Sequence, residues 1–88
     1  MTIGQIVKIK NGRDRDSFMV VVSVQDGYLY LADGRRRKLA CPKRKNIKHV
    51  SPTKGVVNLI PACGRSLQDA DIRKALRTFV LKEVNSIV

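Results

Sequence analysis

The sequence predicts a mainly β protein in which five short strands form a small barrel, followed by a loop and one amphipathic C-terminal helix. Three observations lead to this fold class. The first fifty residues hold short apolar runs with strand-like alternation, and these runs are separated by Asn-Gly and Asp-Gly pairs typical of turns. After residue 66 the apolar residues recur every three or four positions, as in a helix. A chain of 88 residues has room for one domain with one small core.

The first two strands are expected near Val7–Ile9 and over residues 17–24. Val7 and Ile9 alternate with lysines, which is the period of a strand with one buried and one wet face. Residues 17–24 read SFMVVVSV, and this β-branched run is expected to be the most buried strand. The segment between them, residues 13–16, alternates arginine with aspartate and is expected to be a polar loop.

The next strands are expected to follow tight turns at two Asp-Gly pairs, residues 26–27 and 33–34. Such hairpin turns need positive φ at both central residues, which favours this dipeptide. Residues 28–31 read YLYL, with leucines on one face and tyrosines on the other. We expect the fourth strand over Arg35–Cys41 and a short fifth strand over Asn46–Val50. Five short strands joined in this way favour a small closed or half-closed barrel.

Residues 1–51 would form the barrel, and residues 52–88 a C-terminal extension. The extension is expected to begin with a loop around residues 51–55, then an apolar run, residues 56–61, that crosses the barrel mouth or pairs at an edge. A helix is expected over about 67–84, with Ser66 as its N-cap and Asp69 completing a capping box. Its apolar stripe is expected to pack on the barrel; the stripe consists of Ile72, Leu76, Phe79, Val80 and Val84.

The balance of charge limits the kinds of partner. The chain has 18 Lys and Arg against 7 Asp and Glu, a formal net charge of +11. Such a charge favours phosphate polymers or anionic lipid surfaces. No segment approaches the roughly 18 consecutive apolar residues of a membrane span, and the N-terminus lacks the layout of a signal peptide. We therefore expect a cytoplasmic protein with no membrane partner.

Little in the sequence suggests catalysis. The six aspartates have evident structural positions beside arginines, before turn glycines or at the helix start, and there is one histidine, His49. Its glycines form no phosphate-binding loop motif. Cys41 and Cys63 are expected to be reduced thiols, with a disulfide or a metal as the alternative. The expected protein is therefore not an enzyme and has no cofactor, metal or small-molecule substrate.

The strongest functional signal is the basic run of residues 34–48, GRRRKLACPKRKNIK, which carries eight positive side chains and no carboxylate. Such a run can be merely a solvated face. Here it falls on predicted strands and a turn, so its members would be held relative to one another. Two arginines of the first loop would extend it into a cationic wall if both loops lie on the same side. The candidate RNA contacts are Arg13, Arg15, Arg35, Arg36, Arg37, Lys38, Lys43, Arg44, Lys45 and Lys48.

Two aromatic residues accompany these cations. Tyr28 and Tyr30 share one face of the predicted third strand, where they are candidates for stacking on unpaired bases. The alternative is that they simply cover the barrel surface as amphipathic residues.

Residues 4–21 read GQIVKIKNGRDRDSFMVV, which resembles a KOW motif: a glycine, alternating hydrophobic residues, a loop with glycine and a hydrophobic strand. The segments VSVQD (residues 22–26), LADG (31–34), RRR (35–37) and PKRK (42–45) extend the resemblance. They are similar to the KOW domain of the fourteenth large-subunit protein family of archaeal and eukaryotic ribosomes. The chain looks closer still to small stand-alone KOW-domain RNA-binding proteins of Gram-positive bacteria. The resemblance covers residues 3–51 and, for the bacterial group, also residues 69–76.

This resemblance implies an SH3-like barrel that binds structured RNA, with large-subunit ribosomal RNA the foremost candidate and ribosomal proteins as further possible partners. It places the turn of residues 13–16 among the RNA contacts. The family often has a glycine where this chain has Asp16 or its neighbour, so arginine side chains rather than backbone would contact RNA there. Two other functions stay open: an SH3-like protein-interaction module that uses Tyr28, Tyr30 and the helix, and a transcription-associated factor that binds DNA or RNA.

Overall fold

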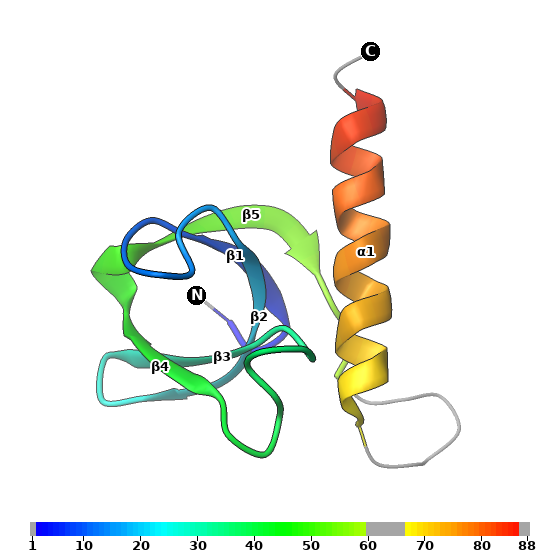
Figure 1. Ribbon diagram of the computed structural model, residues 1–88. Coiled ribbons are helices and arrows are strands. Elements are labelled where there is room, and N and C mark those ends of the chain that lie inside the picture. Colours follow the sequence, from blue (N-terminus) through cyan, green and yellow to red (C-terminus); the bar gives the residue numbers. More distant parts are fainter. Residues whose placement is uncertain (1, 60–66, 87–88) are drawn as a thin grey trace.

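The computed structural model describes residues 2–59 and 67–86 as five strands, one 3-10 turn and one α-helix (Figure 1). In chain order the elements are β1 (Gln5–Ile9), β2 (Phe18–Gln25), β3 (Tyr28–Ala32), β4 (Lys43–Asn46), η1 (Ile47–His49), β5 (Val50–Val56) and α1 (Asp69–Ser86). The predicted class, mainly β with five strands and a C-terminal helix, is therefore confirmed.

The five strands form one antiparallel sheet in the order β4-β3-β2-β1-β5. The sheet curls strongly, and η1 joins its two edge strands, β4 and β5 (Figure 1). Register shifts between Gln5 and Val7 and between Val21 and Ser23 interrupt the pairing, and irregularities of this kind increase local twist. The sheet is not closed, because the described strands form no ladder between β4 and β5.

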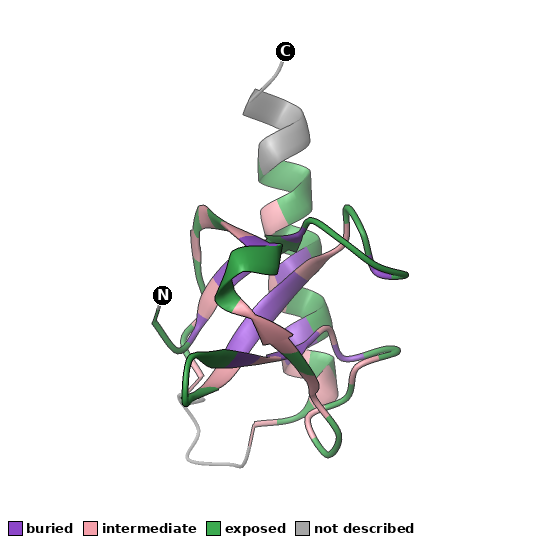
Figure 2. Cartoon of the chain, turned by 90° about the vertical axis from the view of Figure 1, so that its left-hand side faces the viewer, coloured by how far each residue is buried: buried purple, intermediate pink, exposed green. Residues whose placement is uncertain are grey.

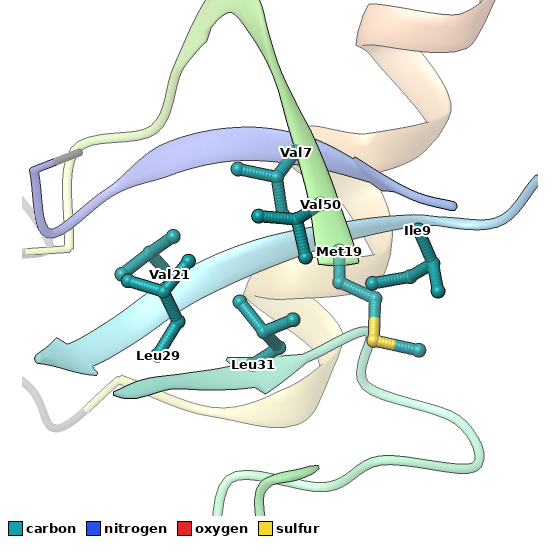
Figure 3. Close-up of a cluster of buried hydrophobic side chains, with 7 residues drawn as sticks. All are labelled: Val7, Ile9, Met19, Val21, Leu29, Leu31 and Val50. Carbon is teal, nitrogen blue, oxygen red and sulfur yellow. The ribbon is translucent and has the colours of Figure 1, made fainter. Parts of the chain in front are cut away.

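An inner cluster of apolar side chains fills the concave side of the sheet. Its members point toward one another from β1, β2 and β3 and from the start of β5 (Figure 3). Pairings such as Val7 with Met19 and Val21 with Leu31 place alternate residues on this side. The inner cluster consists of Val7, Ile9, Met19, Val21, Leu29, Leu31 and Val50, all at most 2% exposed.

An outer cluster lies between the convex side of the sheet and α1. Ile6 and Val20 of the sheet meet Ile72 and Leu76 of the helix, and aromatic rings flank them. Because β2 is covered on both sides, its residues Met19, Val20 and Val21 are all fully buried. Figure 2 shows buried residues through the middle of the sheet, whereas the loops around it are mostly exposed or intermediate.

The expected fourth strand is wrong. Residues 33–42 form a loop, and β4 begins only at Lys43. Asp33 explains the difference, because its Oδ1 accepts backbone N–H bonds from Arg35 (2.8 Å) and Arg37 (2.9 Å) and folds the chain back on itself. The Asp-Gly pair at residues 26–27, by contrast, does form the expected hairpin turn, with φ of 50° and 80°.

The expected short strand over Asn46–Val50 and the loop after it are also wrong. Residues 47–49 form η1, and β5 continues through the expected loop to Val56. Pro52 made this segment look like a loop, but β5 is an edge strand, where a residue without an N–H is tolerated. The predicted domain boundary at residue 51 falls inside β5 and stays a prediction.

The helix was expected at about 67–84 and extends over Asp69–Ser86. The proposed N-cap, Ser66, lies outside the described residues, as do residues 60 and 61 and the side chain of Val84. At the helix start, the Gln68 N–H donates to Asp71 Oδ2 (2.9 Å). The packing of α1 on the sheet is as expected, although Val80 of the predicted stripe is 38% exposed.

Candidate nucleic-acid interface

The loop between β1 and β2, residues 10–17, is folded tightly by its own backbone. The Asp16 N–H donates to the Ile9 carbonyl (2.8 Å), and the Ser17 N–H donates to the Asp14 carbonyl (3.0 Å). Asp16 adopts a φ of 68°, in the left-handed region that glycine favours. Arg13 and Arg15 are exposed, so a hydrogen-bonded loop backbone presents both side chains to solvent.

A partly buried ion pair connects this loop to the loop between β3 and β4. The Asp14 carboxylate, 7% exposed, accepts from Arg37 Nη2 at 2.9 Å and from Nε at 3.3 Å. The 10–17 loop leads into β2 at Phe18, and the 33–42 loop follows the end of β3 at Ala32. Because Ala32 pairs with Val20, two residues after Phe18, both loops lie at the same end of the sheet. The expectation that the two basic loops lie on one side therefore holds for these residues.

The 33–42 loop is in turn fixed to the start of α1. The Arg73 guanidinium donates to the Gly34 carbonyl (2.6 Å), and the Leu39 N–H donates to Asp69 Oδ1 (2.8 Å). Gly34 has a φ of 78°, and a Cβ there would collide with the Asp69 carbonyl oxygen and the Arg73 side chain. The exposed neighbours of this anchor point are Arg35, Arg36 and Lys38.

On its other side the 10–17 loop contacts β4 and η1. Lys45 Nζ donates to the Asn11 carbonyl (2.8 Å), and Asn11 Nδ2 donates to His49 Nδ1 (2.7 Å). The Lys10 N–H also donates to the His49 carbonyl (2.9 Å). These bonds bring Lys45 against the loop, with the exposed Lys48 beside His49 on η1.

We call this surface the loop face. It comprises the 10–17 and 33–38 loops with their two flanking lysines, namely Arg13, Arg15, Arg35, Arg36, Arg37, Lys38, Lys45 and Lys48. Two carboxylates of the loop face already have partners within the protein: Asp14 pairs with Arg37, and Asp33 accepts two backbone hydrogen bonds. Asp16 is exposed and lies 3.8 Å from Lys8 and 3.9 Å from Arg15. The loop face therefore retains a marked excess of positive charge.

The other predicted contacts lie elsewhere. Arg44 pairs with Tyr30 in register, whereas Lys45 pairs with the buried Leu29, so Arg44 and Lys45 point to opposite sides of the sheet. The Arg44 guanidinium lies 4.9 Å from the ring centroid of Tyr28, a cation–π contact on the convex side. Tyr30 and Lys43 are half-buried. Lys43 pairs with the buried Leu31, so it points to the same side of the sheet as Lys45. The outer face of β3 and β4 therefore carries Tyr28, Tyr30 and Arg44, apart from the loop face.

The sequence prediction missed two arginines of α1 that lie beside the loop face. Arg73 bonds Gly34, and Arg77 lies one turn further along the helix. Both line a groove with Arg35. The signal available in the sequence was only their spacing of four residues, which places them on one side of the helix.

Other expectations concern metal ions and membranes. Over residues 2–59 and the described part of α1, no three His, Cys, Asp or Glu side chains come together as metal ligands. Within the same part of the chain, no helix is both long and apolar enough to cross a membrane. Cys41 is an exposed free thiol, and Cys63 lies outside the described residues.

No protein-family model matches the chain, and no curated protein matches it either.

Proposed function

We propose that this chain is a small RNA-binding protein that uses the loop face to bind the phosphate backbone of a structured RNA. Ribosomal RNA of the large subunit is the partner that the KOW resemblance favours. In this proposal Arg13, Arg15 and Arg36 contact phosphates directly, while Arg37 holds the two loops together. No residue has a catalytic role, and no cofactor takes part.

The observation that carries the proposal is the way the arginines are held. Exposed cations on a mobile chain lose conformational freedom when they bind, which weakens binding. Here the Asp14–Arg37 pair, the Asp33 turn and the bonds to α1 fix the backbone of both loops before RNA arrives. Arginine can then form bidentate bonds with phosphate at a lower entropic cost.

Two further observations support the resemblance to KOW domains and, with it, an SH3-like barrel. The curled five-stranded sheet with a 3-10 turn before its last strand is compatible with such a barrel. Asp16, where that family often has glycine, has the positive φ of a glycine position. The loop geometry is therefore compatible with the family motif, although the residue differs.

The proposal predicts a large and localised loss of RNA affinity. A variant with Arg13→Gln, Arg15→Gln and Arg36→Gln is compared with one carrying Lys54→Gln, Lys74→Gln and Lys82→Gln, which removes the same charge from exposed positions on β5 and α1. Binding to a folded fragment of large-subunit ribosomal RNA is measured across salt concentrations. We expect the loop-face variant to lose at least about tenfold in affinity and to reduce the salt slope by about 2 to 3.

The control variant should lose less than about threefold, because its charges contribute only through the long-range field. Equal losses in both variants would contradict a defined loop-face site. Preference for duplex DNA over folded RNA of equal length would instead favour a transcription-associated factor. Weak, salt-independent RNA binding would favour a protein-interaction module.

A further inference from the structure

A groove of about 430 Å³ lies beside the loop face, between α1 and the sheet. Its apolar lining includes Phe18, Leu76 and Val80, and its polar lining includes Arg35, Arg73 and Arg77. Arg35 belongs both to the loop face and to this groove, so the groove opens directly onto the proposed RNA surface.

The charges around the groove are only partly compensated. Among the described residues, the side chains of Arg35 and Arg77 make no ion pair or hydrogen bond. Arg73 uses one nitrogen on the Gly34 carbonyl. Asp16 and Asp33 also line the groove, but Asp33 accepts backbone bonds and Asp16 lies near Lys8 and Arg15. The groove therefore combines apolar surface with two available guanidinium groups.

From this arrangement we propose that the groove holds one unpaired nucleotide of the bound RNA. Its base lies against the apolar side chains of α1 and β2, and its phosphates face Arg35 and Arg77. Proteins read RNA mainly at loops and bulges, where a base can leave the helix and stack on apolar or guanidinium planes. A purely apolar ligand would leave the guanidiniums unused, and an RNA duplex would leave the apolar lining exposed.

This inference rests on the proposed function and adds a preference for RNA with an unpaired nucleotide. The test uses two RNA hairpins of the same length, one fully paired and one with a single-nucleotide bulge. The full-length protein is expected to bind the bulged hairpin about tenfold more tightly. Arg77→Gln and Leu81→Gln should each reduce this preference to less than about threefold, while affinity for the paired hairpin changes less than about twofold. Leu81 also lines the groove and is 55% exposed, so its replacement should not unfold the protein.

A matched control is Lys74→Gln, which removes the same charge from α1 but lines a different groove, next to β5. It should keep the preference for the bulged hairpin. Equal binding of both hairpins by the unaltered protein would overturn the groove inference and leave the proposed function standing. So would a loss of affinity for both hairpins in Arg77→Gln. Binding to neither hairpin would contradict the proposed function itself.

Discussion

The inner and outer apolar clusters share one sheet but depend on different parts of the chain. Every inner residue lies between Val7 and Val50, and all of them belong to strands. The outer cluster joins Ile6 and Val20 to Ile72 and Leu76, more than fifty residues later. The sheet thus has a core of its own, whereas its convex side is apolar because α1 covers it. The two clusters should respond differently to the same kind of substitution.

The largest effect is expected in the inner cluster. Leu31 is fully buried between β2 and β4, so Leu31→Ala removes packing on all sides and leaves a cavity. We expect the free energy of unfolding in urea to fall by about 4 kcal/mol. Val56→Ala, at a residue that is 70% exposed on β5, is the control and should cost less than about 0.5 kcal/mol.

A smaller effect is expected in the outer cluster. Leu76 is 8% exposed and contacts the sheet from one side of α1, so Leu76→Ala should cost about 3 kcal/mol. The signal of β structure and that of the helix should still disappear together in circular dichroism. A cost near zero, or a helix that melts before the sheet, would mean that α1 is separable from the sheet.

Elements that depend on local sequence were easier to predict than elements that depend on residues distant in the chain. Strands with a clear apolar period, such as β1 and β3, were predicted at nearly the right residues. β4 reads KRKN and has no apolar residue, so only its pairing with β3 identifies it as a strand. β5 contains a proline and a glycine, and Gly55 is needed because a Cβ there would press on the Phe79 ring of α1. Both strands are defined by neighbours distant in sequence.

The candidate site divides in a similar way. Composition and spacing identify the arginines of both segments, but they predict a loop only for residues 13–16 and place residues 35–41 on a strand instead of the loop that they form. They cannot separate Arg36 from Arg37, because the difference lies in a carboxylate 23 residues before Arg37. The groove arginines of α1 were missed since their importance depends on how the helix docks against Gly34.

The smallest predicted effect on stability concerns the 33–42 loop, which joins the 10–17 loop to α1. Arg37 contacts the 10–17 loop through Asp14, while its neighbours in the 33–42 loop bond α1. Arg37→Gln leaves a carboxylate that is 7% exposed without its charged partner. Because Arg37 itself is 31% exposed, solvent moderates the loss, and we expect a cost of about 1.5 kcal/mol in urea unfolding.

Arg36→Gln is the matched control, because Arg36 is exposed and makes no described side-chain bond, and it should cost less than about 0.5 kcal/mol. The double variant Asp14→Asn, Arg37→Gln should be more stable than Arg37→Gln alone, since it removes the unpaired charge. When Arg36→Gln and Arg37→Gln are both fully folded, the order for RNA affinity should be reversed, with the larger loss in Arg36→Gln. Arg36→Gln loses a phosphate contact, whereas Arg37→Gln only loosens the loops that carry such contacts. If Arg37→Gln weakened RNA binding more than Arg36→Gln without any loss of stability, Arg37 would be a direct contact and its pairing with Asp14 would be secondary.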